Sequence, residues 1–134
     1  MTKEDKDFLI KRISEMLEAD ERIMFAYIFG SFISGNGFRD IDVAVFISGE
    51  DAHPLKAELE MEAKIEAATH LPVDVRIINN APLSFVYNVL KHKSVIVDKD
   101  KSLRTDFEGL IFKKYFDYRH LREEYLREIV NAPL

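Results

Sequence analysis

The sequence predicts an α/β protein of the α+β kind, with a small mixed β-sheet of about four strands and helices packed on it. Stretches with helical periodicity alternate with short apolar runs typical of buried strands. Two of these runs, 23–29 and 41–47, are joined by a short loop, which indicates antiparallel neighbours. The 134 residues contain no repeat and no linker, so we expect a single domain over 1–134.

The first half of the chain is predicted to contain helix, strand, strand and helix in that order. Residues 4–18 carry apolar side chains at a 3.6-residue period among Lys and Glu, which predicts an amphipathic helix. The run IMFAYIF over 23–29 is continuously apolar and ends at a glycine, as a buried strand does. A loop is expected over 31–39, followed by an alternating strand over 41–47 and a helix over 55–69.

The second half continues the alternation of strands and helices. Residues 73–78 (VDVRII) and 94–98 (SVIVD) predict two further strands. Between them a helix is expected over 82–91, with Asn80 as its cap. From Ser102 onward, apolar residues recur at spacings of three and four, which predicts one long helix or two.

Composition excludes several classes of function. The absence of cysteine excludes disulfides, zinc–thiolate sites and thiol nucleophiles. A formal net charge of −5 argues against an extensive nucleic-acid surface. No apolar run approaches the length of a membrane span, and the charged N-terminus is no signal peptide, so we expect a cytoplasmic protein.

Three aspartates are the candidate catalytic residues and metal ligands. Asp40 and Asp42 lie two positions apart at the start of a strand, so their carboxylates project to the same side. Such close like charges repel each other unless a cation lies between them, and Mg²⁺ prefers carboxylate oxygens. Asp74 is a carboxylate inside another apolar strand, and three acids on neighbouring strands suit two metal ions.

Gly30 and Ser31 are the candidate phosphate-binding pair. They follow an apolar strand and open a glycine-containing turn, where backbone N–H groups and a hydroxyl can face a phosphate. Gly30 has no Cβ, so the backbone can approach a ligand closely.

The segment GSFISGNGFRDIDVAVFI (30–47), followed by VDVRII, resembles the minimal nucleotidyltransferases (MNT) of the DNA polymerase β superfamily. The resemblance covers a core of about 22–98 and leaves 102–130 as a C-terminal helical region. It implies the polymerase β-like fold and a site in which the Gly-Ser pair holds the nucleotide phosphates. It also implies that Asp40 and Asp42 coordinate the metal ions, and that Asp74 is the remaining ligand and helps activate the attacking hydroxyl.

The sequence departs from the family pattern in the loop. Only eight residues separate Ser31 from Asp40, which is a shorter loop than the family usually has. Ser34 occupies a position where the family often has Arg or Lys, and Arg39 is the candidate replacement for contact with the triphosphate.

Stand-alone members of this family often accompany a helical HEPN-type toxin. The resemblance therefore implies an antitoxin that transfers AMP from ATP, with Mg²⁺, to a tyrosine of such a toxin. One alternative is a non-catalytic module that neutralises its partner by occlusion. Another is a transferase for a small-molecule hydroxyl, such as that of an aminoglycoside, although those relatives usually have a further helical domain.

Two structural alternatives stay open at the level of the sequence. Asp74 is either a metal ligand or an edge-strand carboxylate paired with Arg76 or Lys64. The last helical stretch has more aromatic residues than one buried face needs. Some of them are expected to pack in the core, and the remainder either lie singly on the surface or form an exposed patch that is an interface with a second copy or a partner. These aromatic residues are Phe107, Phe112, Tyr115, Phe116, Tyr118 and Tyr125.

Overall fold

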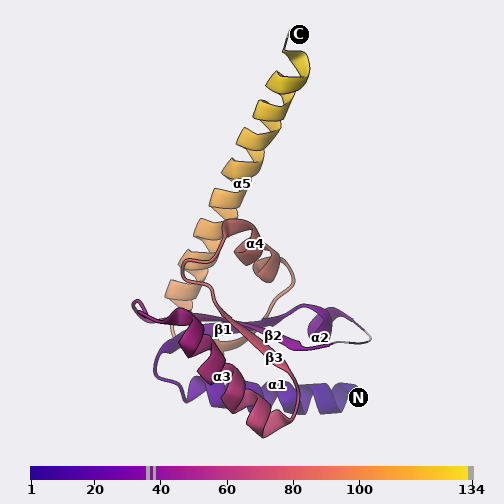
Figure 1. The fold of residues 1–134 in the computed structure, drawn as a ribbon, viewed down its shortest axis with the longest axis vertical. Helices are drawn as coiled ribbons and strands as arrows, with labels where there is room; N and C mark the ends of the chain where they lie inside the picture. Colours follow the sequence, from indigo (N-terminus) through magenta and orange to yellow (C-terminus); the bar gives the residue numbers. More distant parts are fainter. Residues whose placement is uncertain (36, 38, 133–134) are drawn as a thin grey trace.

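The computed structural model describes residues 1–35, 37 and 39–132. It contains four strands and five helices along the chain (Figure 1). In order they are α1 (Lys3–Glu18), β1 (Ile23–Phe29), α2 (Ser31–Ser34), β2 (Ile41–Ile47), α3 (Pro54–Thr69), β3 (Val73–Ile77), α4 (Leu83–Lys91), β4 (Ser94–Asp98) and α5 (Lys101–Asn131).

The four strands form one mixed sheet in the order β3-β2-β1-β4. β1 is antiparallel to both β2 and β4, as the short connection between 23–29 and 41–47 predicted. β3 is parallel to β2 and is reached through the crossover helix α3. The fold class inferred from the sequence is therefore confirmed, and the strand with the Asp-x-Asp motif lies inside the sheet.

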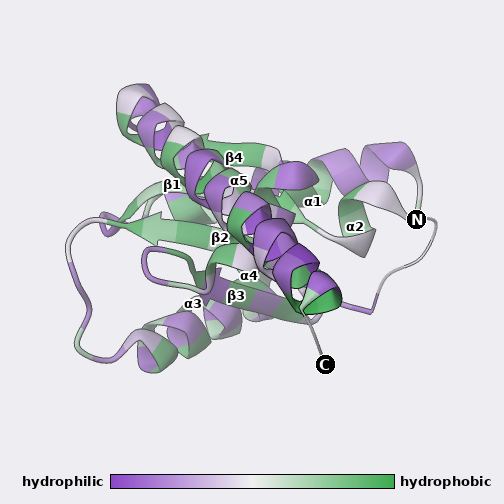
Figure 2. Cartoon of the chain, turned by 90° about the horizontal axis from the view of Figure 1, so that it is seen from above, coloured by the Kyte–Doolittle hydropathy of each residue, from purple (hydrophilic) through white to green (hydrophobic). Residues whose placement is uncertain are grey.

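Helices cover both faces of the sheet. α1 and α3 lie on one face, and α4 with the first half of α5 lies on the other (Figures 1 and 2). Alternate residues of β2 separate accordingly: Val43 and Val45 pack with α1 and α3, whereas Ala44 and Phe46 pack with α4 and α5. Because side chains alternate along a strand, Asp42 belongs to the face of Ala44 and Phe46.

α1 is fixed at its start and along its buried side. Thr2 and Asp5 form a capping box, in which each side chain accepts a hydrogen bond from the other residue's backbone N–H. Ile13 and Leu17 are buried against the sheet. The Ser14 hydroxyl donates to the backbone carbonyl of Ile96 at 2.5 Å, which ties α1 to β4.

The free edge of β3 is covered by α3. Three glutamates spaced four residues apart on α3 accept hydrogen bonds from the backbone N–H groups of alternate residues in β3. The strand that carries Asp74 is therefore held by β2 on one side and by α3 on the other. The bonds join Glu66 to Val73 (2.9 Å), Glu62 to Val75 (2.9 Å) and Glu58 to Ile77 (2.8 Å).

Three details differ from the sequence-based expectations or resolve them. The segment expected as a loop begins with the helical turn α2, and its positions 36 and 38 lie outside the described residues. Asn80 does not cap α4, because the helix begins after Pro82 without a side-chain cap, and it is Asn79 that hydrogen-bonds the backbone of Ile47. α5 is one continuous helix of 31 residues. Among the described helices, none is both long and apolar enough to span a membrane.

Candidate active site

Asp42 and Asp74 are direct neighbours across the parallel strands β2 and β3. The register pairs Ile41 with Val73 and Asp42 with Asp74, so both carboxylates project from the same face of the sheet. Asp40 lies just before β2 begins. Oxygen atoms of the three carboxylates all lie within 4.8 Å of one another, and each residue is half-buried. The structure thus brings together the three acids that the sequence singled out.

The charges of this cluster are poorly compensated within the described part of the chain. Burial, followed by the charges of Asp40 and Asp74, raises the pKa of Asp42 to about 6. Among the described residues, one cation is paired with the cluster: Arg76 Nε lies 3.4 Å from Asp74 Oδ1, and the Arg76 side chain is exposed. Of the two partners considered for Asp74, the structure selects Arg76, while Asp40 and Asp42 have no ion pair with a described residue.

This donor set fits a hard divalent cation. Mg²⁺ binds carboxylate oxygens, keeps several waters and takes phosphate oxygens of a substrate as further ligands. Three half-buried carboxylates without sufficient counter-charge are such a donor set, and Asp40, Asp42 and Asp74 are the residues that would hold the ion. The ion pair with Arg76 does not oppose this role, because an exposed pair of this kind contributes little to stability.

Gly30 brings the turn after β1 against the acidic cluster. Its φ is +80°, a conformation that residues with a Cβ rarely adopt. A Cβ placed on Gly30 would collide with Oδ2 of Asp42 and would lie 3.4 Å from the Cγ of Asp42. A side chain at position 30 would therefore require the Asp42 carboxylate to move. Ser31 begins α2 at this point and is exposed.

The turn α2 is anchored from α1 by Lys6. Its ammonium group donates to the backbone carbonyls of Phe32 at 3.2 Å and Gly35 at 3.3 Å, and lies 5.4 Å from the centre of the Phe32 ring. Phe32 itself is buried in the core between α1 and the sheet. Sequence reasoning missed Lys6, because a lysine on an amphipathic helix has the same pattern whether it is solvated or makes such contacts.

The two loop residues that depart from the family pattern, Ser34 and Arg39, differ in their contacts. The Ser34 hydroxyl donates to the carbonyl of Gly30 at 3.1 Å, so this side chain stabilises the turn. Arg39 is exposed next to Asp40, and its contact with a triphosphate stays a prediction.

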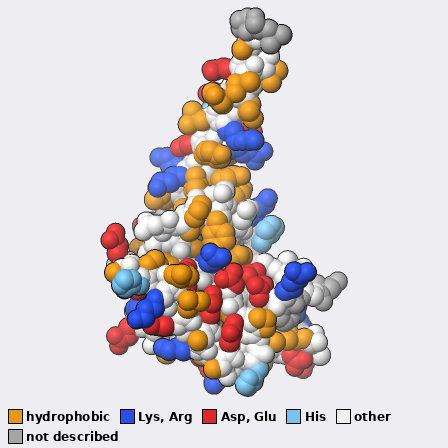
Figure 3. All heavy atoms as spheres, viewed as in Figure 1, with side chains coloured by type: hydrophobic (Ala, Val, Ile, Leu, Met, Phe, Trp, Pro, Cys, Tyr) orange, Lys and Arg blue, Asp and Glu red, His pale blue; other side chains and the backbone are white. Residues whose placement is uncertain are grey.

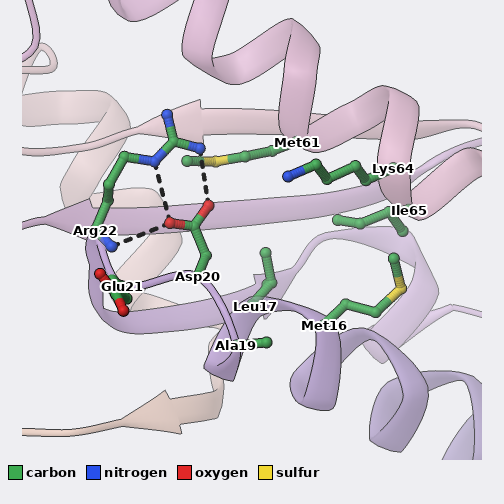
Figure 4. Close-up of a pocket in the computed structure, with 9 residues that line it drawn as sticks. All are labelled: Met16, Leu17, Ala19, Asp20, Glu21, Arg22, Met61, Lys64 and Ile65. Carbon is green, nitrogen blue, oxygen red and sulfur yellow. Dashed lines mark hydrogen bonds and ion pairs between the residues drawn. The ribbon is translucent and has the colours of Figure 1, made fainter.

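A separate hollow lies on the opposite side of the sheet, between the end of α1 and α3 (Figure 4). Two of its charged side chains are paired with each other: Arg22 donates to Asp20 at 2.8 Å, which lowers the pKa of Asp20. Met16, Met61 and Ile65 line the rest. The acidic cluster on the other face is therefore the candidate active site.

Comparison with known proteins supports this assignment of the site to a class. Residues 11–102 match the family described as "Polymerase beta, Nucleotidyltransferase". The match spans more than half of the chain and contains all three aspartates, so the chain belongs to the polymerase β nucleotidyltransferase family.

Solved structures with the same fold come from toxin–antitoxin complexes. A chain in the complex of a tri-AMPylated Shewanella oneidensis HEPN toxin with an MNT antitoxin aligns with a TM-score of 0.66 and 22% identity, over 95% of this chain and 98% of its own. A chain of the toxin–antitoxin MntA–HepT aligns with a TM-score of 0.64 and 21% identity, and the alignment covers 94% of this chain and 97% of that one. A chain of a toxin–antitoxin with AMP-PNP aligns with a TM-score of 0.60 and 23% identity, and the alignment covers 98% of both chains. No curated protein matches the chain significantly by sequence.

Proposed function

We propose that this chain is a Mg²⁺-dependent adenylyltransferase that moves AMP from ATP to a tyrosine hydroxyl of a HEPN-type toxin and acts as its antitoxin. The observation that carries the proposal is the in-register pairing of Asp42 with Asp74, with Asp40 beside them and all three carboxylates within 4.8 Å. Membership of the nucleotidyltransferase family supports the type of reaction.

The proposed roles of the acids follow from their positions. Asp40 and Asp42 hold the metal, and Asp74 completes a second ion site. Bound Mg²⁺ supplies positive charge that neutralises the triphosphate and the charge developing in the transition state. Asp74 lies on the edge strand β3 with its side chain 40% exposed, and we propose that it is the carboxylate that accepts the proton of the incoming hydroxyl.

The reaction is an in-line displacement at phosphorus. The acceptor oxygen forms a bond to the α-phosphorus of ATP while the bond from that phosphorus to the oxygen bridging to the β-phosphate breaks. The acceptor's proton passes to the carboxylate of Asp74, and the electron pair of the broken bond leaves with pyrophosphate. The products are an AMP phosphodiester on the acceptor and pyrophosphate.

Gly30 and Ser31 hold the β- and γ-phosphates in this proposal. The absence of a Cβ at Gly30 lets the backbone lie against Asp42, which places the exposed Ser31 next to the acidic cluster. A protein with the same fold has been solved with AMP-PNP, an ATP analogue, which supports a nucleoside triphosphate as the substrate. We propose the cytoplasm as the location of the reaction, because the proposed substrates ATP and Mg²⁺ are available there.

The partner is inferred from the proteins that share the fold. One such structure holds a HEPN toxin carrying three AMP groups together with its MNT antitoxin. A toxin with a surface tyrosine is therefore the acceptor that we propose for this chain.

Transfer of label from ATP distinguishes this reaction from its alternatives. ATP labelled at the α-phosphate should label the toxin in the presence of Mg²⁺, whereas ATP labelled at the γ-phosphate should not. Asp42→Asn should remove the labelling, and Asp106→Asn, an exposed aspartate on α5, is the matched control that should retain it. Labelling from the γ-phosphate, or by the Asp42→Asn variant, would exclude the proposed chemistry.

A further inference from the structure

The second half of α5 extends beyond the rest of the protein with an uncovered apolar face. In Figure 1 the helix continues far past α4, and Figure 3 shows hydrophobic side chains along its projecting part. Five residues on one side of this part are 42% to 64% exposed. We call them the α5 stripe: Tyr118, Leu121, Tyr125, Leu126 and Ile129.

The stripe lies on the same face of α5 that is buried in the first half of the helix. Phe107 and Ile111 pack in the core with α4, and Tyr115 stacks on Tyr87 of α4 with ring centres 3.7 Å apart. At the helical period, Tyr118 and Tyr125 lie on the same side as Phe107 and Ile111. The first half of this face is covered by α4, and the second half has no such cover among the described residues.

The base of α5 is firmly attached, so the projecting part has a defined direction. The Tyr27 hydroxyl, fully buried in the sheet, donates to Glu108 at 2.7 Å. Glu108 also pairs with Lys93 at 2.6 Å and with Arg104 at 3.1 Å, and Arg104 pairs with Asp98 at 3.0 Å. These contacts join the first turns of the helix to β1, to β4 and to the residue that precedes β4.

The charges beside the stripe disfavour an antiparallel pair of two copies. Asp117, Glu124 and Glu128 lie along one edge of the stripe. Arg119 lies along the other edge, and Arg122 lies within the stripe itself. In a two-fold antiparallel pair of helices, like edges meet, so the acidic edge of one copy would lie against the acidic edge of the other.

A parallel pair of two copies is blocked by α4. It would bring opposite edges together, but both copies of α4 would then occupy the same space between the two α5 helices. A second copy of the chain therefore fits the stripe poorly in either orientation.

We propose that the α5 stripe is the docking site for the helical HEPN-type toxin, seated through an apolar helix face with basic residues along the border that meets Asp117 and Glu128. This inference rests on the proposed function and adds the surface by which the acceptor is held. The five residues offer on the order of 500 Å², about half of the roughly 1,000 Å² that a biological interface buries in total.

The position of the stripe suits the delivery of an acceptor. Asp42 projects from the face of the sheet that α4 and α5 cover. A partner packed on the stripe above α4 therefore lies on the same side of the sheet as the acidic cluster. Docking and reaction use one side of the molecule, and they involve different residues.

Binding is tested with the HEPN-type protein encoded beside this chain, by isothermal titration calorimetry. Tyr125→Glu and Ile129→Glu each introduce a charge into the stripe, and each should weaken the complex at least about 30-fold. Phe116→Glu is the matched control, because Phe116 is an aromatic residue on the opposite side of α5 that is even more exposed than Tyr125, and it should bind as the wild type does. Circular dichroism and melting of each variant show that the fold is kept.

The outcomes separate this inference from the proposed function. Asp42→Asn should bind the toxin with wild-type affinity while losing transfer, and Tyr125→Glu should keep its stabilisation by Mg-ATP while losing the toxin. Wild-type binding by the two stripe variants would overturn the docking site even if AMP transfer is intact. A genome of origin without a HEPN-type gene, or a homodimer in light scattering that Tyr125→Glu dissociates, would overturn it as well.

Discussion

Gly30 lies against the carboxylate of Asp42 so closely that a Cβ on residue 30 would collide with Oδ2. The two residues come from paired strands: Phe29, the last residue of β1, is the register partner of Asp42 in β2. The turn that we propose for phosphate binding and the aspartate that we propose as the central metal ligand are therefore in direct contact. A substitution at either residue should therefore disturb the position of the other.

Replacing Gly30 by alanine tests this contact. The added Cβ meets the Asp42 carboxylate, and alanine disfavours a φ of +80°, so Gly30→Ala should lose about 1–3 kcal/mol of unfolding free energy. AMP transfer should fall by about 100-fold or more, because the reacting groups are displaced. Urea denaturation and the labelling assay measure the two effects.

Gly37→Ala is the matched control for this change. A Cβ at Gly37 meets no atom within 4 Å, and its φ is not in the positive region. The control should keep both stability and activity. If Gly30→Ala behaved as Gly37→Ala does, the close contact with Asp42 would have no functional role.

The metal-free protein should become more stable when Asp42 is replaced by asparagine. The pKa of Asp42 is about 6 in the folded protein against 3.8 for an ordinary aspartate, so folding favours the protonated form. The wild type therefore loses stability as the pH rises from about 4 to 6. Water screens part of the repulsion, so Asp42→Asn should gain on the order of 1 kcal/mol at pH 7.

Urea denaturation in EDTA at several pH values measures this gain. The advantage of Asp42→Asn should shrink as the pH falls from 6 to below 4, because the wild-type carboxyl then becomes protonated first in the folded and finally in the unfolded state. Mg²⁺ should stabilise the wild type and not the variant. A variant less stable than the wild type at pH 7 in EDTA would contradict the strain that we assign to the acidic cluster.

Glu62 should stabilise β3 through its hydrogen bond to the backbone. It accepts from the N–H of the buried Val75 at 2.9 Å, next to Asp74. Glu62→Ala leaves this N–H without its partner, so it should cost about 1–3 kcal/mol. Glu60→Ala is the control, because Glu60 makes one long, exposed contact of 3.9 Å with Arg22 and should change stability little. Equal melting temperatures for the two variants would show that α3 does not hold this edge.

The strands and the acidic cluster were predictable because their signals are local. Apolar runs end at Gly30, and the alternation in 41–47 places Asp42 on the opposite face from Val43. The third acid was predictable as a carboxylate inside an apolar strand. Sequence spacing alone left both Arg76 and Lys64 open as partners of Asp74. The structure pairs Asp74 with Arg76, which lies two residues further along the same strand and therefore on the same face.

Other parts of the site depend on contacts between distant segments. The bonds from Lys6 to the turn α2 span 26 and 29 residues, and the glutamates of α3 meet β3 only once the crossover has formed. Asn80 has a favourable capping side chain, yet Asn79 is held by Ile47 and the chain enters α4 through Pro82. Single-sequence patterns contain no information on such partners, because the same residues would also suit a solvated surface.

Intact-mass spectrometry of the HEPN-type partner, after incubation with this protein, ATP and Mg²⁺, tests the central claim most directly. The account predicts a gain of one or more AMP units with the wild type and with Asp106→Asn, located on a tyrosine, and no gain with Asp42→Asn. An unchanged toxin mass in a complex that still forms would contradict the account, and would leave neutralisation by occlusion as the function of this chain.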